Sequence, residues 1–331
     1  MQEIQITAKD AGQRLDKYLK KYLPEAGSGF LYKMLRKKNI TLNGKKAEGN
    51  ENIKERDVIR IFFSEETLAK MRGRAFSGNG APEETGAAAQ DPRRERALKA
   101  YRSLAGIGIV YEDEDLLFVN KPAGIFSQED DNGALSLNDW IYGYCIQNKT
   151  PEEAAFVPAV CNRLDRNTSG LVLCGKTYAG SRFLSDMIRG HGLRKIYRAV
   201  AEGKMTGEGR LQGYWSKDSS KNIVCITPKA LHPQDPQVET KYRVLRYREK
   251  DDCTLTEVEL ITGKSHQIRA HFASIGHPLA GDLKYGGHPR KGTRSQLLHA
   301  YAVQFPAIEG AFSRISGKQF CAAVSWLEEW E

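Results

Sequence analysis

A short polar segment near the middle of the chain carries the residue best suited to chemistry. Asp165 lies between Arg163 and Arg166 in NRLDRNTSG, which leads directly into the apolar run LVLCG. Loops at strand ends are places where a rigid scaffold holds reactive side chains. A flanking guanidinium favours the ionised carboxylate, which can add to an electrophilic carbon or accept a proton. Taken alone, however, an aspartate in such a loop is more often an ion-paired structural residue.

Further polar motifs lie on both sides of this segment in the sequence. NKPAG (120–124) precedes it, and the motifs that follow are RKIYRAV (194–200), TGKSHQIRAH (262–271), GHPLAGDLKYGG (276–287) and LLHA (297–300). Considered singly, Tyr197 in RKIYRAV would be a core aromatic residue on a strand. Gln267 and His271 are four residues apart, so on a helix they would share one face.

In this order and at about this spacing, the motifs resemble those of the RluA-type RNA pseudouridine synthases, over residues 107–305. The resemblance implies an enzyme that detaches uracil from ribose in RNA, rotates it and reattaches it through carbon 5. It also implies the catalytic roles. Asp165 is the catalytic carboxylate, Tyr197 packs against the target base and helps to remove the proton from carbon 5, and Arg269 pairs with Asp165. Asp165 would act either by adding to the anomeric carbon or through a deprotonated sugar, and the sequence leaves both routes open.

The neighbouring residues of these motifs receive supporting roles. Arg163 and Arg166 are expected to contact the RNA backbone or to position the loop. His266, Gln267 and His271 are expected to support the pocket structurally.

Two positions depart from the family pattern. Asn162 stands where the family usually has His, and Lys264 stands where it usually has Arg. Asn can still form hydrogen bonds, whereas Lys keeps the charge but loses the two-pronged guanidinium. These departures leave the expected activity in place and bear on the choice of substrate.

The sequence lacks the signatures of several other enzyme classes. It has no P-loop, no dinucleotide fingerprint after a strand and no HxE…CxxC deaminase motif. Its six cysteines are scattered, without a CxxC pair or a Cys/His cluster at metal-ligand spacing. An isomerisation needs neither redox chemistry nor a nucleotide, so we expect no cofactor and no metal.

Hydropathy and charge indicate where the protein works and what it binds. No apolar run of about 18 residues occurs and the N-terminus does not resemble a signal peptide, which predicts a cytoplasmic protein without a membrane span. The net charge is +9, and residues 1–63 hold 14 Lys and Arg against 8 Asp and Glu. Such a basic segment favours a polyanionic partner, here RNA. We take the monomer as the default oligomeric state.

Residues 1–63 have the pattern of a small domain. Apolar residues at helical spacing predict helices over 12–23 and 30–39. Residues 40–47 are predicted to be a strand that runs into an Asn43-Gly44 turn, and residues 57–63 to be a closing strand after a polar loop. This order resembles the RNA-binding domain of ribosomal protein S-four. The basic residues that match its RNA-binding helices and turn are Arg14, Lys17, Lys33, Arg36, Lys37, Lys38, Lys45 and Lys46.

The remaining chain divides into a linker and a larger domain. Residues 64–104 are rich in Gly, Ala and polar residues, which predicts a linker with a helical turn or two near its end. Residues 105–331 show more strand patterns than helix patterns. We therefore predict an α+β catalytic domain with a large mixed, mostly antiparallel sheet flanked by helices and loops.

Alternatives remain beside the main hypothesis, which is a pseudouridine synthase acting on large-subunit ribosomal RNA. In the first alternative, the same enzyme acts on transfer RNA. In the second, the protein is a non-catalytic RNA-binding or ribosome-assembly protein on the same fold. A uracil glycosylase is disfavoured because no motif for activating water stands out.

Overall fold

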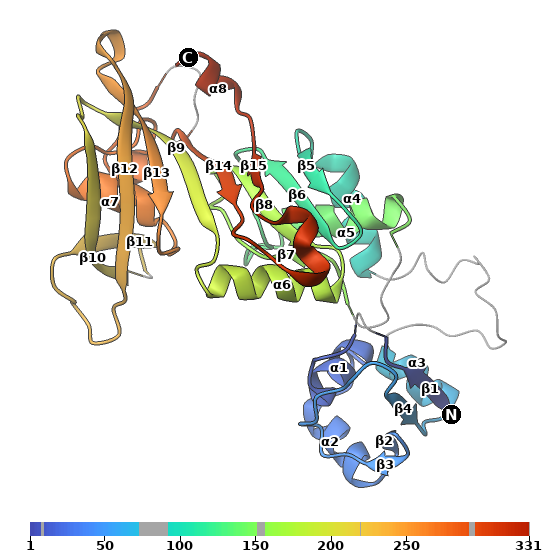
Figure 1. The fold of residues 1–331 in the computed structure, drawn as a ribbon. Helices are drawn as coiled ribbons and strands as arrows, with labels where there is room; N and C mark the ends of the chain where they lie inside the picture. Colours follow the sequence, from blue (N-terminus) through green and yellow to red (C-terminus); the bar gives the residue numbers. More distant parts are fainter. Residues whose placement is uncertain (8–9, 73–91, 151–155, 219, 291–294, 331) are drawn as a thin grey trace.

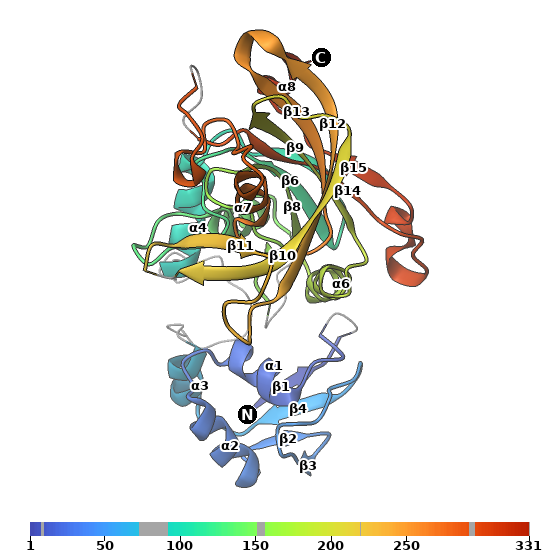
Figure 2. The same cartoon turned by 90° about the vertical axis from the view of Figure 1, so that its left-hand side faces the viewer.

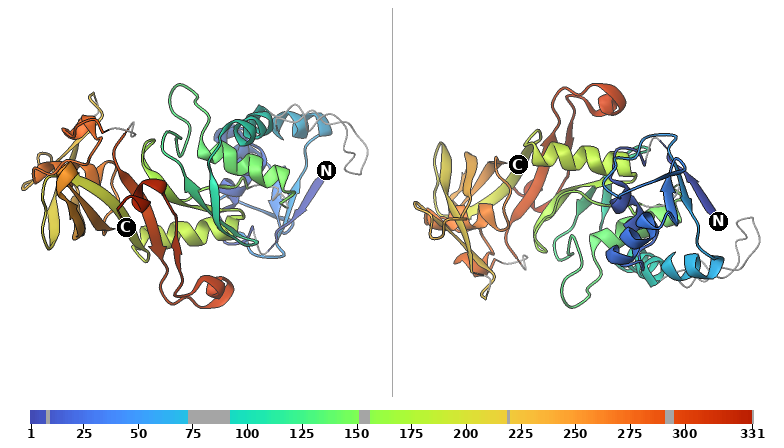
Figure 3. Two further views of the ribbon diagram at one scale, coloured as in Figure 1. Left: turned by 90° about the horizontal axis from the view of Figure 1, so that it is seen from above. Right: turned by 90° about the horizontal axis from the view of Figure 1, so that it is seen from below.

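The computed structural model describes residues 1–7, 10–72, 92–150, 156–218, 220–290 and 295–330 (Figure 1). Within these residues the strands form two sheets, one of four strands and one of eleven. The first sheet belongs to the N-terminal segment and the second to the rest of the chain. Figure 3 shows the N-terminal strands at one end of the molecule and the strands β10 to β13 at the other.

The N-terminal unit packs two helices on a small antiparallel sheet of order β1-β4-β2-β3. Its elements are β1 (Gln2–Gln5), α1 (Leu15–Tyr22), α2 (Ser28–Arg36), β2 (Ile40–Leu42), β3 (Lys45–Lys46) and β4 (Val58–Ile61). The core contains fully buried Leu15 and Leu19 of α1 and Ile59 of β4. Asn43 and Gly44 have φ of 51° and 72°, the left-handed pair that a tight hairpin requires, so the predicted turn is confirmed.

Two helices lie in the segment for which the sequence predicts a linker. They are α3 (Glu65–Arg72) and α4 (Pro92–Ser103), and residues 73–91 between them lie outside the described residues. Ala97 and Ala100 of α4 are completely buried against α5 (Leu137–Gln147). The two helices approach so closely that a Cβ atom on Gly143 would lie 2.2 Å from the carbonyl oxygen of Ala97. Helix α4 therefore packs as part of the larger unit.

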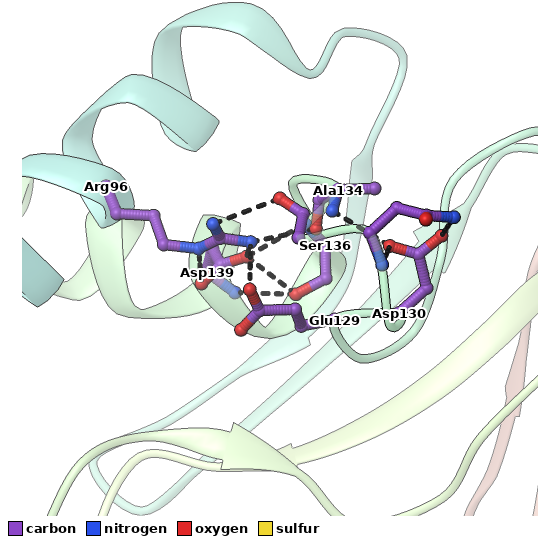
Figure 4. Close-up of polar contacts among 8 residues, drawn as sticks. Arg96, Glu129, Asp130, Ala134, Ser136 and Asp139 are labelled. Carbon is purple, nitrogen blue, oxygen red and sulfur yellow. Dashed lines mark hydrogen bonds and ion pairs between the residues drawn. The ribbon is translucent and has the colours of Figure 1, made fainter.

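A polar cluster centred on Arg96 ties α4 to the loop before α5 (Figure 4). The Arg96 guanidinium donates to both carboxylate oxygens of Asp139, at 3.0 and 3.2 Å, and to the carbonyl of Ala134 at 2.8 Å. Asp139 also closes a capping box with Ser136 at the start of α5. The cluster thus fixes the loop of residues 126–136, which packs beside the loop that carries Asp165.

The large sheet has the order β11-β10-β12-β13-β9-β14-β8-β6-β5, with β15 paired to β14 and β7 paired to β8. Its only parallel pair among the described strands is β14 with β8, so the predicted mixed, mostly antiparallel sheet is confirmed. The strands are β5 (Gly108–Glu112), β6 (Leu116–Lys121), β7 (Ala159–Val160), β8 (Ser169–Gly175), β9 (Arg194–Glu202), β10 (Glu208–Asp218), β11 (Ile223–Thr227), β12 (Gln237–Arg248), β13 (Cys253–Leu260), β14 (Leu298–Gln304) and β15 (Gln319–Cys321).

Helices cover both faces of the central strands. Leu117 of β6 packs in the cluster with α4, α5 and α7 (Gln267–Ser274), whereas its neighbour Phe118 packs in the cluster with α6 (Tyr178–Arg189). Strand β8 is buried along its whole length, which explains its continuous apolar sequence. Figure 2 shows α7 in front of the sheet and, away from α7, the helix α6 near the N-terminal unit.

We expect Gly143→Ala to destabilise the protein by about 1–3 kcal/mol, because the added methyl group meets the backbone of Ala97 and overpacks the α4–α5 contact. Urea unfolding followed by circular dichroism measures this change. Gly29→Ala in α2 is the matched control, because nothing lies within 4 Å of its added methyl group and helix propensity favours the change. Equal stability of the two variants would contradict the role given to Gly143.

Candidate active site

The order of the strands brings Asp165 and Arg269 together although they are 104 residues apart. Asp165 lies in the loop that enters β8, and Arg269 lies in the first turn of α7, which follows β13. The Arg269 Nη1 donates to Asp165 Oδ2 at 3.2 Å. The Arg269 side chain is 8% exposed and that of Asp165 is 24% exposed, so the pair lies at the boundary between core and solvent.

A second carboxylate, which the sequence analysis missed, holds the same arginine. Asp282 accepts from Arg269 Nε at 2.6 Å and from Nη2 at 2.7 Å, a two-pronged ion pair whose carboxylate is 1% exposed. Burial opposes the charged guanidinium, but the hydrogen bonds and charge of Asp282 outweigh it and hold the pKa of Arg269 above its usual value. One arginine therefore serves two carboxylates, which leaves one negative charge in excess. The GDLKYGG motif was the available signal for Asp282.

The flanking arginines are not the charge partners of Asp165, which corrects the expectation from the sequence. Arg163 Nη1 donates to Gln128 Oε1 at 3.3 Å, and Arg166 Nε donates to the carbonyl of Gly124 at 3.1 Å. The Arg166 guanidinium also lies 4.8 Å from the centre of the Phe126 ring. Adjacent residues of a turn point in different directions, so closeness in sequence did not become contact. Both arginines are exposed and their unused N–H groups face solvent.

Tyr197 lies on β9, buried in the cluster that includes Leu164 of the Asp165 loop. Burial, with a contribution from the charge of Asp165, raises the pKa of Tyr197 well above its usual value. The phenol therefore stays protonated near neutral pH. This favours the packing role expected for the ring, whereas proton removal by its oxygen would first require a deprotonation that the surroundings oppose.

A completely buried lysine holds the backbone of the site, and it too was missed. Lys121, in the NKPAG motif, donates from Nζ to the carbonyls of Pro122, Ile125 and Arg166 at 3.0, 2.9 and 3.1 Å. Burial lowers the pKa of Lys121 to about 7, opposed by the charge of Asp165. Its three acceptors join the strand-end turn to the residue beside Asp165.

Other side chains hold the segments that carry Asp165 and Arg269 in place. Ser127 Oγ donates to the carbonyl of Leu164 at 2.8 Å and lies 3.0 Å from the Leu164 amide. Gln267 Nε2 donates to Thr240 Oγ1 at 3.0 Å, and His271 Nδ1 lies 2.8 Å from the same hydroxyl. Gln267 and His271 thus share one helix face, as the sequence predicts, and both fix α7 against β12.

The two departures from the family pattern have local structural roles. Asn162 Oδ1 accepts from the amide of Leu173 at 2.7 Å, which ties the loop to β8. The backbone amide of Lys264 donates to Gln267 Oε1 at 3.1 Å, in the turn before α7. Neither residue contacts Asp165 within the described part of the chain.

The basic residues predicted to bind RNA in the N-terminal unit are all exposed. Lys33 and Arg36 lie in the last turn of α2, and Lys45 and Lys46 form β3 after the hairpin turn. Arg14 is already engaged, because its guanidinium donates to both oxygens of Asp16 at 3.0 and 3.1 Å. The remaining residues of the predicted set are Lys17, Lys37 and Lys38.

The described residues contain no group of three or more His, Cys, Asp or Glu side chains arranged to hold a metal ion. Among the described helices, none combines the length and apolar character that a membrane span requires.

Comparisons with known proteins agree on one family. Residues 115–274 match the family model described as RNA pseudouridylate synthase. The chain is 30% identical to the ribosomal large subunit pseudouridine synthase D of Yersinia pestis, over 87% of this chain and 79% of that protein. It is 27% identical to an uncharacterised RNA pseudouridine synthase of Mycoplasma genitalium, over 92% of this chain and 89% of that protein.

A solved structure has the same fold. Human RNA pseudouridylate synthase domain containing 1 superposes with a TM-score of 0.53 at 21% identity, covering 68% of this chain and 86% of that one.

We expect Lys121→Met to destabilise the protein by at least about 2 kcal/mol, because it leaves three partly buried carbonyls without their donor. Urea unfolding measures the loss. Lys318→Met, at an exposed position with no side-chain hydrogen bond among the described residues, is the matched control and should stay within about 0.5 kcal/mol of the wild type. A Lys121→Met variant as stable as this control would show that the three hydrogen bonds contribute nothing.

Proposed function

Because the chain belongs to the family of RNA pseudouridine synthases, we propose that it converts specific uridines of ribosomal RNA to pseudouridine, with Asp165 as the catalytic carboxylate. The choice of ribosomal RNA rests on relatives named ribosomal large subunit pseudouridine synthases, among them one from Escherichia coli that is 28% identical over 87% of this chain. The basic N-terminal unit agrees with a large, structured RNA as substrate.

One observation carries the proposal, namely the way in which Asp165 is held. Both of its side-chain partners, Arg269 at 3.2 Å and His266 at 3.7 Å, face Oδ2. Within the described residues no group donates a hydrogen bond to Oδ1. The carboxylate is therefore anchored through one oxygen, and the other is available to a substrate. A fixed carboxylate with one free oxygen suits addition to the anomeric carbon or abstraction of a sugar proton.

The surroundings of Asp165 suit a nucleotide turned out of its stack. An enzyme that breaks a glycosidic bond must expose the bond, which requires the base to leave the RNA stack for a pocket. Tyr197 and Leu164 provide an apolar wall beside the carboxylate. We assign Tyr197 the packing of the uracil ring. Exposed Arg163 and Arg166, on either side of Asp165, are suited to the phosphates that flank the flipped nucleotide.

The N-terminal unit is proposed as an S-four-like RNA-binding domain within residues 1–63. Its support is a separate core, two helices, a hairpin and a set of exposed basic side chains on α2 and β3. We propose that the catalytic domain begins at Pro92 and not at residue 105, since α4 packs in the core with α5.

We expect Asp165→Asn to lower the single-turnover rate constant at least about a thousand-fold, because an amide can neither add to the sugar nor take its proton. RNA affinity should stay within about threefold. Purified protein is incubated with ribosomal and transfer RNA transcripts, and pseudouridine is mapped by carbodiimide labelling and primer extension.

Asp186→Asn, an exposed change on α6, is the control and should be fully active. Modification of transfer RNA alone would transfer the proposal to that substrate. RNA binding without any modification by the wild type would instead support a non-catalytic RNA-binding protein.

Neutralising four basic residues at the end of α2 should weaken RNA binding with little effect on the chemical step. The changes are Lys33→Gln, Arg36→Gln, Lys37→Gln and Lys38→Gln. The plot of log affinity against log salt concentration has a negative slope. We expect its magnitude to decrease by up to about 3, because each lost phosphate contact lowers that magnitude by about 0.7–0.9.

The matched control neutralises four exposed lysines of the larger unit, namely Lys221, Lys229, Lys250 and Lys318. An equal change in slope for both sets would argue against a binding surface on the N-terminal unit.

A further inference from the structure

His266 faces the catalytic carboxylate from a constrained position. It is the residue before α7, its φ is 56°, and its side chain is 13% exposed. Its Nε2 lies 3.7 Å from Asp165 Oδ2. A left-handed backbone is uncommon for a residue other than glycine, and it persists only where the surroundings hold it. The tryptophan of β10 contributes, since Trp215 Nε1 donates to the carbonyl of Ser265 at 3.0 Å.

Tyr285, in the short helix η3 (Leu283–Tyr285), determines which nitrogen of His266 carries hydrogen. The backbone amide of Val224 donates to Tyr285 Oη at 2.9 Å, and Oη lies 2.8 Å from His266 Nδ1. Oη accepts from Val224, and Nδ1 of His266 is its other hydrogen-bond partner among the described residues, so this geometry favours donation of the hydroxyl hydrogen to Nδ1. A neutral imidazole whose Nδ1 accepts carries its hydrogen on Nε2. The Nε2–H bond therefore faces Asp165.

Burial, and not the balance of the surrounding charges, is the main reason why the ring of His266 stays neutral. Burial lowers its pKa below the usual 6.5, Arg269 and Lys284 act in the same direction, and Asp165 and Asp282 oppose them. Tyr285 is neutral as well, since burial raises its pKa. At pH 7 the only cation hydrogen-bonded to Asp165, among the residues described, is thus Arg269.

We propose that His266 is a positioning residue of the reaction, an uncharged Nε2–H donor fixed by Tyr285 that keeps Asp165 turned so that Oδ1 faces the sugar. The proposal rests on the proposed function. The separation of 3.7 Å in the free protein exceeds a hydrogen bond, and such contacts tighten when substrate binds. A neutral donor orients the carboxylate without adding a second positive charge. A second positive charge would make the carboxylate a weaker nucleophile and a weaker base. Protonation of His266 below pH 6.5 would add that charge.

The first arm of the test measures rates on an RNA that the wild type modifies. His266→Asn tolerates the left-handed backbone but cannot reach Asp165. It should lower the single-turnover rate constant about 10–100-fold, with RNA affinity within about threefold. His266→Gln carries an amide N–H at a similar reach and should restore part of the rate. His277→Gln, at the end of α7 with its ring on the carbonyl of Glu202, is the matched control and should match the wild type.

A structural role alone would not produce the expected coupling with Tyr285. Tyr285→Phe should lower the rate in the wild-type background but not in the His266→Asn background, because the hydroxyl acts through the histidine. Below pH 6.5, protonation of the His266 ring should lower the rate of the wild type. The rate of His266→Gln should fall less in this range, because glutamine does not take up the proton. Additive effects of the two substitutions, or a His266→Asn variant with the wild-type rate, would overturn the proposal.

The second arm needs no RNA, so its failure is distinguishable from failure of the proposed function. Nitrogen NMR of protein with ¹⁵N-labelled histidines should show His266 as the neutral Nε2–H form at pH 7, identified by the signal that His266→Gln removes. Tyr285→Phe should release this preference. A charged ring or the Nδ1–H form in the wild type would overturn the inference. A wild type that modifies no RNA while His266 keeps the Nε2–H form would overturn the proposed function alone.

Discussion

The site depends on one guanidinium shared between two carboxylates. Asp282, almost completely buried, takes two of the N–H groups of Arg269 and fixes the plane of the guanidinium. The third contact, to Asp165, is longer and reaches the boundary with solvent. A buried charge must be paired, so Arg269 cannot leave Asp282 without a large cost in free energy. Asp165 is therefore held by a rigid partner and still carries the excess negative charge of the group.

Hydrogen bonds from side chains to the backbone fix the loop around Asp165, as Asp282 fixes Arg269. Lys121 joins the end of β6 to the carbonyl of Arg166, and Ser127 binds the backbone of Leu164. The loop that contains Ser127 is fixed in turn by Arg96 of α4. Three segments that are distant in sequence thus hold one loop, which fixes the position of the Asp165 carboxylate.

The electrostatics of the site follow from the same arrangement. Burial keeps Tyr197 protonated and His266 uncharged, so Arg269 is the one cation hydrogen-bonded to Asp165 among the described residues. Exposed positive charge lies outside this centre, on Arg163 and Arg166 and on the helices of the N-terminal unit. The fold thus separates its exposed positive charge, which attracts polyanions, from the single cation that is hydrogen-bonded to Asp165.

The sequence by itself determined the family, through several motifs in order, and predicted the elements whose apolar residues follow a regular period, such as α1 and α2. It gave no helix for α5, because Trp140 and Ile141 are buried in an element without a clear polar face. The residues around Asp165 suggested its flanking arginines as charge partners, and only the resemblance to the family named Arg269. Strand order brings Arg269, 104 residues away, to Asp165, and Asp282 holds the same guanidinium from behind. The periodicity of apolar residues can be recognised in the sequence, because it depends on neighbouring residues alone. Ion pairs between distant loops form only when the sheet has assembled.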